Sequence, residues 1–188
     1  MTNHQIVLGF LAKNPDLEFY EREIARKTGI SFGSANQVLN DLHAQGYVLR
    51  QQKGRMFFYS INEMDPLYRN YKIFYTSLLI RPLIKKLIPD SHKIILYGSC
   101  AAGTDTSKSD IDIFIVSDKK AKILKVIGDY TFQRGFQDTI IEPVIYSPQD
   151  LLQSEKNNRD FLSLIREGII LWDKTDSDSH FEELKGLG

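Results

Sequence analysis

The chain has 188 residues, of which 42% are hydrophobic and 26% are charged, a composition that excludes a disordered or fibrous protein. Its length suits two small domains, each just large enough to bury its own core. The single cysteine excludes an internal disulfide and no apolar run reaches membrane-spanning length, so we expect a cytoplasmic protein without a membrane partner.

Charge is spread unevenly along the chain, although the formal net charge is zero. Residues 1–88 hold 12 Lys and Arg against 7 Asp and Glu, which gives +5, and residues 89–188 hold 12 against 17, which gives −5. This asymmetry favours a polyanion as the partner of the first half and a metal cation as the partner of the second.

Apolar residues at helical spacing predict three short helices near the N-terminus. They cover residues 5–11, 20–27 and 31–45. Gly29 lies where a left-handed C-cap would end the second helix, and Ser31 provides an N-cap for the third. These two helices form a helix-turn-helix. Two β-prone runs, at 47–50 and 56–61, then predict a hairpin with a basic tip.

The third helix and the hairpin carry the side chains that we expect to contact duplex DNA. Asn and Gln can pair with adenine edges in a major groove, and basic residues neutralise phosphates. The candidate DNA-binding residues are Ser34, Asn36, Gln37, Asn40, Arg50, Lys53 and Arg55. The alternatives are a solvated helix face and a protein-contact module. Three short helices followed by a hairpin, over about residues 4–62, resemble the winged-helix domains of transcriptional regulators.

Asp65-Pro66 opens a longer helix, at residues 65–88, in which Pro82 predicts a kink or a restart. Its aromatic stripe consists of Tyr68, Tyr71, Phe74 and Tyr75. Aromatics at this spacing are more typical of a core or a dimer seam than of base stacking, and the seam is our preferred interpretation. It predicts a homodimer formed through the 65–88 helix.

From residue 92 the pattern changes to strands and helices in alternation. Strands are predicted at 92–97, 111–117, 139–146 and 169–172, and helices at 119–136, 150–154 and 158–167. Continuous apolar runs in the first two strands indicate that helices cover at least one face of the sheet. The polar, acidic residues 173–188 are expected to be loosely held.

The run LYGSCAAGTDTSKSDIDIFIV carries the most specific chemistry in the sequence. Side chains alternate along a strand, so Asp110 and Asp112 point to the same face and can share a divalent cation. Gly98 and Ser99 follow the preceding strand, and a Gly-Ser turn lets backbone N–H groups and a hydroxyl approach phosphate oxygens. We therefore expect a phosphate-binding turn next to a pair of metal-binding carboxylates.

Gly-Ser followed after ten residues by Asp-x-Asp resembles the signature of the DNA polymerase beta-like nucleotidyltransferases, particularly the minimal prokaryotic ones, and the resemblance covers about residues 70–172. It implies that Asp110 and Asp112 bind Mg²⁺, with two ions in the active complex. It also implies that Gly98 and Ser99 hold the triphosphate, and Gly103 and Ser109 fit the same pattern. Residues 100–102 depart from it, because relatives often place an arginine there.

The resemblance also implies a third carboxylate from a later strand, for which we favour Glu142 as catalytic residue and metal ligand. Asp138 is the alternative, but it lies at the start of the strand, where an aspartate can be solvated. Glu142 shares a face with Val144 and Tyr146, and a carboxylate buried in such an apolar strand needs a cation or a donor. Pro143 predicts that the strand lies at an edge or bulges.

These features predict an α+β protein with a winged helix-turn-helix domain at 1–64, a helical connector at 65–91 and a nucleotidyltransferase domain with a mixed sheet at 92–188. The expected activity transfers a nucleoside monophosphate from a nucleoside triphosphate to an acceptor hydroxyl, which a protein or a nucleic acid could provide. The alternative function is a DNA-binding transcriptional regulator whose second domain only senses nucleotide or metal.

Overall fold

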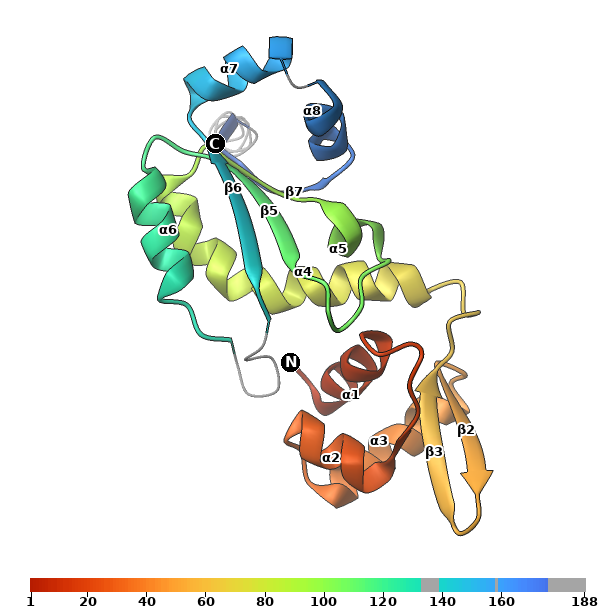
Figure 1. Cartoon of the computed structure of the whole chain (residues 1–188). Helices are drawn as coiled ribbons and strands as arrows, with labels where there is room; N and C mark the ends of the chain where they lie inside the picture. The colour runs from red at the N-terminus through yellow and green to blue at the C-terminus, as the bar shows by residue number, and fades with distance from the viewer. Residues whose placement is uncertain (133–138, 158, 176–188) are drawn as a thin grey trace, which may run out of the picture. The chain divides into compact units, whose positions relative to one another are not determined.

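The computed structural model describes residues 1–132, 139–157 and 159–175, and the chain divides into two compact units (Figure 1). The first unit consists mainly of Met1–Thr76 together with the loop Gly103–Ser109. The second contains Ser77–Ala102, Asp110–Thr131 and the described residues from Thr139 onward.

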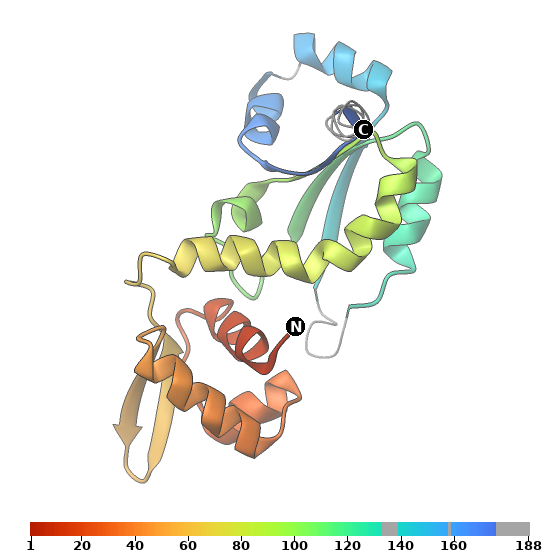
Figure 2. The same ribbon diagram turned by 180° about the vertical axis from the view of Figure 1, so that it is seen from behind.

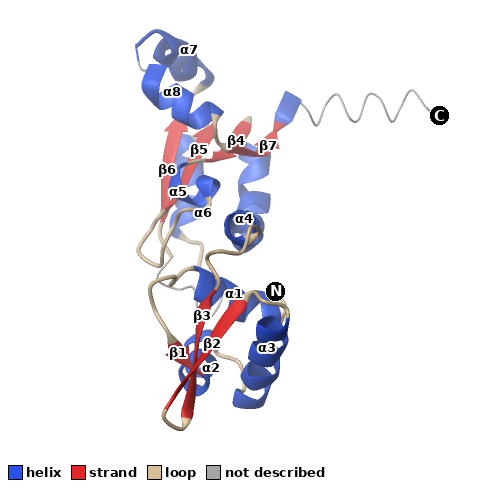
Figure 3. Cartoon of the chain, turned by 90° about the vertical axis from the view of Figure 1, so that its right-hand side faces the viewer, coloured by secondary structure: helices blue, strands red, loops and turns tan. Residues whose placement is uncertain are grey.

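The first unit is a three-helix domain with a small antiparallel sheet, coloured by secondary structure in Figure 3. Its elements are α1 (Asn3–Ala12), β1 (Phe19–Tyr20), α2 (Glu21–Thr28), α3 (Phe32–Ala44), β2 (Val48–Lys53), β3 (Met56–Ile61) and the beginning of α4 (Tyr68–Leu87). The strand order is β1-β3-β2. The predicted helix-turn-helix and hairpin are confirmed, whereas the two-residue strand β1 was not predicted.

Local capping chemistry sets the ends of these helices. Thr2 and Gln5 form a reciprocal capping box at the start of α1, which satisfies two backbone N–H groups that the helix leaves unpaired. Gly29 ends α2 with a φ of 73°, a left-handed conformation that favours glycine. The hydroxyl of Ser31 accepts from the backbone N–H of Ser34 and caps α3.

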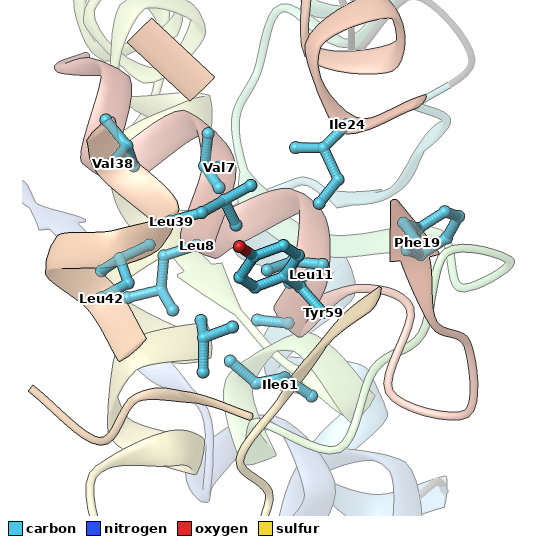
Figure 4. Packing of buried hydrophobic residues seen from close by; sticks show 12 residues of the cluster. Val7, Leu8, Leu11, Phe19, Ile24, Val38, Leu39, Leu42, Tyr59 and Ile61 are labelled. Atoms are coloured by element: carbon cyan, nitrogen blue, oxygen red, sulfur yellow. The ribbon is translucent and has the colours of Figure 1, made fainter. Parts of the chain in front are cut away.

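One apolar cluster joins the helices to the sheet in the first unit. It contains Val7, Leu8, Leu11, Ala12, Phe19, Ile24, Val38, Leu39, Leu42, Val48, Tyr59 and Ile61. Figure 4 shows the Tyr59 ring from β3 lying among side chains of the three helices. Each helix therefore buries one apolar stripe against the others, and the opposite face of α3 stays exposed.

The tyrosines of α4 pack on α1 within the first unit, so our interpretation of this stripe as a dimer seam is wrong. Tyr75 is buried, and its ring lies so close to Gly9 that a Cβ there would meet it at 2.0 Å. The Tyr71 and Tyr68 hydroxyls donate to the backbone carbonyls of Gln5 and Ala12. Phe74 is the exposed aromatic of the stripe, and a homodimer stays a prediction.

The loop Gly103–Ser109 contains a carboxylate that is completely buried, that of Asp105. One of its oxygens lies 2.7 Å from Nζ of Lys13 on α1, and the other lies 3.5 Å from Nζ of Lys72 on α4. Lys72 also donates to the backbone carbonyl of Asp105. Because the Lys13 and Lys72 side chains are only 16% and 3% exposed, this is a buried ion cluster.

The second unit is a mixed four-stranded sheet of order β6-β5-β4-β7. Its elements are the end of α4, a 3₁₀ turn (Ile88–Asp90), β4 (Lys93–Leu96), α5 (Gly98–Ala102), β5 (Ile111–Val116), α6 (Lys120–Gly128), β6 (Ile141–Tyr146), α7 (Pro148–Asn157), α8 (Arg159–Arg166) and β7 (Ile169–Asp173). The β5–β6 pair is parallel and the other pairs are antiparallel. Strand β6 is an edge strand of the described sheet, as Pro143 predicts.

Helices cover the sheet on both faces. Figures 1 and 2 show the end of α4, which belongs to this unit, lying across one face, with α6 on the same side. On the other face, Leu151, Phe161 and Ile165 of α7 and α8 pack against Ile95, Tyr97 and Phe114 of the strands. This double cover explains the continuous apolar runs of β4 and β5.

Three sequence expectations differ from the structure or lie outside it. Pro82 predicts a kink or a restart, and of these two the restart is absent, because helix α4 continues through Pro82 with buried residues on both sides. The helix predicted at 119–136 ends at Gly128, and residues 133–138 lie outside the described residues, including the candidate Asp138. The same holds for most of the predicted loose tail, from residue 176.

No helix in the described ranges combines the length and the apolar character that crossing a membrane requires.

Candidate functional site

Three side chains from adjacent strands form one row across the sheet of the second unit. Asp112 on β5 is in register with Glu142 on the parallel strand β6, so both side chains point to the same face. Tyr97 follows β4, and its backbone N–H donates to the carbonyl of Asp112 at 3.1 Å. Asp110 precedes Asp112 by two residues and is partly buried like it. The face that carries the row is the one that α7 and α8 cover further along the strands.

Gly98 brings the turn after β4 directly against this row. Its φ is 70°, and a Cβ built on it would lie 2.4 Å from Oδ2 of Asp112. An L side chain at this position would therefore be strained by its backbone and would also collide with the carboxylate. The absence of a side chain at Gly98 is what allows the Gly-Ser turn and the Asp112 carboxylate to lie in contact.

Negative charge gathers around the half-buried carboxylate of Asp112. Burial raises the pKa of Asp112 above its ordinary value, and the negative charges of Glu142 and Asp110 raise it further. Burial also raises the pKa of the Tyr97 phenol, with further contributions from Asp112 and Glu142. No cationic side chain in the described part of the chain counters the shift of Asp112. The fold thus brings like charges together without a protein partner to balance them.

The oxygen-only donor set of this row fits Mg²⁺, which prefers carboxylate oxygens. Among the described residues, no group of three or more His, Cys, Asp or Glu side chains is arranged to hold a metal ion. Proteins usually bind Mg²⁺ through one or two carboxylates together with waters and substrate phosphates, rather than in an all-protein cage. Asp110 and Asp112 supply that smaller number of protein ligands.

Glu142 is exposed, and this corrects the physical argument that we made for it. We expected an apolar strand to bury the carboxylate, so that it would need a partner. Because β6 is an edge strand, Glu142 reaches solvent instead, and its place beside Asp112 rests on strand register.

The two candidate serines differ in how they are engaged. The Ser109 hydroxyl accepts from the backbone N–H of Thr106 at 2.9 Å and closes a turn in the loop. Ser99 is half-buried in α5 and forms no side-chain hydrogen bond to any described residue. The Sγ of Cys100, one residue later, is directed toward the carbonyl of Asp110 at 3.5 Å. Ser99 is therefore the hydroxyl that is available to a ligand at this turn.

An aromatic cluster next to Asp112 and Glu142 was not predicted from the sequence. The rings of Tyr97, Phe114 and Tyr146 meet Phe161 of α8, with centroid distances of 6.0 to 6.2 Å. Tyr97, Phe114 and Tyr146 lie on the face of Asp112 by strand alternation, and this periodicity was available in the sequence. The contribution of Phe161 depends on tertiary packing and had no sequence signal.

In the first unit, the candidate DNA-binding residues of α3 lie on its exposed side but are engaged to different degrees. Asn36 donates to Glu21 of α2, and Asn40 donates to Asn36. The Ser34 hydroxyl accepts from Ser31 at 2.9 Å. Gln37 is exposed and forms no side-chain hydrogen bond within the described ranges.

The three basic residues of the hairpin also differ in their contacts. The Arg50 guanidinium donates to Asn40 at 3.3 Å and lies 4.9 Å from the centre of the Phe57 ring. Lys53 forms an ion pair with Glu18. Arg55, at the exposed tip, forms no ion pair with a residue in the described part of the chain. Arg55 is thus the hairpin cation that is most available to a phosphate.

The N-terminal and C-terminal parts of the chain match different protein families. Residues 3–55 match the MarR family, and residues 80–177, just over half of the chain, match the family "Polymerase beta, Nucleotidyltransferase". The first match contains the helix-turn-helix and the first strand of the hairpin with its turn, and the second contains Asp110, Asp112, Glu142 and the Gly-Ser turn. No curated protein matches the chain.

Solved structures with partial similarity include three DNA-binding or regulatory proteins. The DNA-binding protein Sso10a-2 from Sulfolobus solfataricus is 17% identical over 47% of this chain and 94% of its own, with a TM-score of 0.38. The transcription regulator MepR from Staphylococcus aureus is 17% identical over 46% and 66%, with a TM-score of 0.37. A mutant of ZitR from Lactococcus lactis in complex with DNA is 20% identical over 47% and 71%, with a TM-score of 0.30. These scores are too low to carry an argument, so the family assignments rest on the sequence matches.

Proposed function

We propose that this chain, which belongs to the polymerase beta nucleotidyltransferase family, transfers a nucleoside monophosphate from a nucleoside triphosphate to an acceptor hydroxyl. We propose further that its MarR-type winged helix binds duplex DNA. The observation that carries the enzymatic proposal is the row of Asp112 and Glu142 beside Gly98, with a negative charge that no described cation balances. Carboxylates in this arrangement can bind a divalent cation that enters the site together with a triphosphate.

In the proposed reaction, an acceptor oxygen attacks the α-phosphorus, the bond to the bridging oxygen of the β-phosphate breaks, and pyrophosphate leaves. Mg²⁺, held by Asp110 and Asp112, would neutralise the phosphate charges and polarise the reacting oxygens. Gly98 leaves room for the triphosphate at the turn, and the Ser99 hydroxyl can donate to a phosphate oxygen. Glu142, which is exposed at the sheet edge, can accept the proton of the acceptor hydroxyl.

The enzymatic proposal is tested by incubating the protein with α-labelled nucleoside triphosphates, Mg²⁺ and a cell lysate. We expect label to appear covalently on an acceptor, and Asp110→Asn, Asp112→Asn and omission of Mg²⁺ should each abolish it. The second candidate function is a regulator whose second domain senses nucleotide. It holds if the native protein binds Mg²⁺-nucleotide but transfers no label to an acceptor. The carboxylates support both functions, and we rank the regulator second because the exposed Glu142 beside Asp112 has a role only in transfer.

DNA binding is supported by the exposed Arg55 at the hairpin tip and by the exposed polar side of α3. Its affinity should fall as salt rises, because bound cations are released from the phosphates. Anisotropy titrations of fluorescent duplexes at several salt concentrations measure this, and Arg55→Ala should reduce the salt slope by about one unit. Absence of binding to any duplex at low salt would refute it. We also propose a cytoplasmic location, because both proposed partners, DNA and nucleoside triphosphates, occur there.

A further inference from the structure

The polar residues on the exposed side of α3 form a chain of hydrogen bonds that ends at Glu21, the first residue of α2. Nδ2 of Asn36 donates to Oε1 of Glu21 at 3.0 Å. One helical turn later, Nδ2 of Asn40 donates to Oδ1 of Asn36 at 3.1 Å. Nη1 of Arg50 on β2 donates to Oδ1 of Asn40 at 3.3 Å. We call Glu21, Asn36, Asn40 and Arg50 the Glu21 relay.

The two charged ends give the relay a single direction. An ionised carboxylate can only accept and a guanidinium can only donate, so the NH₂ group of Asn36 must face Glu21. Oδ1 of Asn36 then faces Asn40, and Oδ1 of Asn40 faces Arg50. An isolated amide can turn over and exchange its oxygen with its nitrogen at little cost. Here the two charges fix which edge each asparagine presents.

Glu21 is itself held from the core side by Tyr59. The Tyr59 hydroxyl donates to the same Oε1 of Glu21 at 3.0 Å, and its ring is buried in the apolar cluster of the first unit. Burial, and then the neighbouring Glu21, raise the pKa of Tyr59 by more than the nearby Arg50 lowers it, so the phenol keeps the proton that it donates. The carboxylate is thus anchored to a buried residue on β3, while the relay extends toward the exposed side of α3.

A carboxylate on a DNA-binding surface weakens the binding, because it repels phosphates, so its presence there requires an explanation. We propose that Glu21 is a specificity-determining residue for duplex DNA, and that it acts by orienting Asn36 and Asn40 rather than by contacting a base. This inference rests on the proposed DNA binding. Each asparagine keeps one N–H donor and one oxygen lone pair outside the relay. Their fixed order decides which base edge the pair can match.

The test replaces Glu21 by the isosteric glutamine, with Glu23→Gln as the matched control. A glutamine at position 21 can accept from Asn36 or donate to it, so both relay directions become available. Glu23 lies in the same first turn of α2 and forms no side-chain hydrogen bond to a described residue, so its replacement changes the charge alone. Thermal melting establishes that both variants fold, and an NMR titration of Tyr59 should show its pKa lowered only in Glu21→Gln.

Preferred duplexes are first selected with the native chain from a random-sequence pool, and affinities for a selected and a scrambled duplex are then measured. Both variants should bind scrambled duplex somewhat more tightly, because each loses one negative charge. The ratio of selected to scrambled affinity should fall at least about tenfold in Glu21→Gln and stay unchanged in Glu23→Gln.

An unchanged ratio in Glu21→Gln, or an equal fall in both variants, would overturn the specificity role while leaving DNA binding in place. If the native chain binds no duplex at all, the proposed DNA function fails, and the specificity role fails with it. The titration of Tyr59 then still reports whether its contact with Glu21 exists. The two failures are therefore distinguishable.

Discussion

Asp105 and Asp112 lie seven residues apart in the chain, and the fold treats their carboxylates in opposite ways. Asp105 is completely buried and has two lysines as partners, Lys13 and Lys72. Asp112 is only partly buried, and the charged groups that shift its pKa are carboxylates, Glu142 and Asp110. The first arrangement balances its charge within the protein. The second leaves negative charge for something outside the protein to balance.

This difference separates a structural acid from a functional one. When one partner of a buried ion pair is removed, the other charge stays buried without compensation, so the loss should destabilise the protein strongly. Clustered like charges destabilise the free protein and are useful when a cation or phosphate chemistry requires them. Stability and activity measurements on the same variants should therefore give opposite results at the two positions.

The largest expected effect is on stability, for Asp105→Asn. Removing the carboxylate leaves Lys13 and Lys72 without their buried counter-charge, which should lower the free energy of unfolding by about 3–5 kcal/mol. Urea denaturation measures it, with Asp112→Asn as the control in the same stretch of chain. A loss below about 1 kcal/mol would mean that the buried ion cluster is not a structural requirement.

The next effect is on catalysis, for Glu142→Gln. Because Glu142 is exposed and is proposed to accept the proton of the acceptor hydroxyl, the rate of transfer should fall about 100-fold. Mg²⁺-nucleotide affinity should change little, since Asp110 and Asp112 hold the metal. Single-turnover labelling and calorimetry separate the two quantities. If the transfer rate and the Mg²⁺-nucleotide affinity fall equally, Glu142 acts in binding and has no separate catalytic role.

A smaller effect is expected for Gly98→Ala, which places a Cβ against Oδ2 of Asp112 at a φ of 70°. The backbone strain alone should cost about 1–2 kcal/mol of stability, and displacement of the carboxylate should weaken Mg²⁺-nucleotide binding. Gly128→Ala is the matched control, because a Cβ there meets no atom within 4 Å. If Gly98→Ala binds nucleotide as the native chain does, the contact with Asp112 is not part of the site.

The smallest effect is a gain in stability for Asp112→Asn without divalent cations. The pKa of Asp112 is raised in the folded state, so ionisation costs the native chain stability as pH rises from the ordinary carboxylate range through the raised value. Asparagine carries no such cost. The variant should be more stable by up to about 1 kcal/mol above that range and equal to the native chain at low pH. A lower stability at neutral pH would show that Asp112 is structural after all.

The sequence predicted the features that depend on local periodicity. The stripes of α1 to α3, the cap at Gly29 and the strand β5 all follow from side-chain spacing, which the backbone geometry of helices and strands dictates. The edge position of β6 followed from Pro143, which cannot donate a ladder hydrogen bond.

Features that depend on tertiary partners could not be predicted. A single aspartate in a polar loop gives no sign that Lys13 and Lys72 will enclose it, and Asp105 was not singled out. The tyrosines of α4 have the same spacing whether they meet α1 or another chain, and only the packing against Gly9 decides between these. Strand β1 has two residues, which is too short for any alternation to appear.

Calorimetric titration of the Asp110→Asn and Asp112→Asn variants decides whether these two carboxylates form the site where Mg²⁺ and a nucleoside triphosphate bind. The native chain should bind a non-hydrolysable nucleoside triphosphate with Mg²⁺. Each variant should lose this binding while it unfolds at or above the native urea midpoint. Undiminished Mg²⁺-nucleotide affinity in both folded variants would show that Asp110 and Asp112 do not form this site.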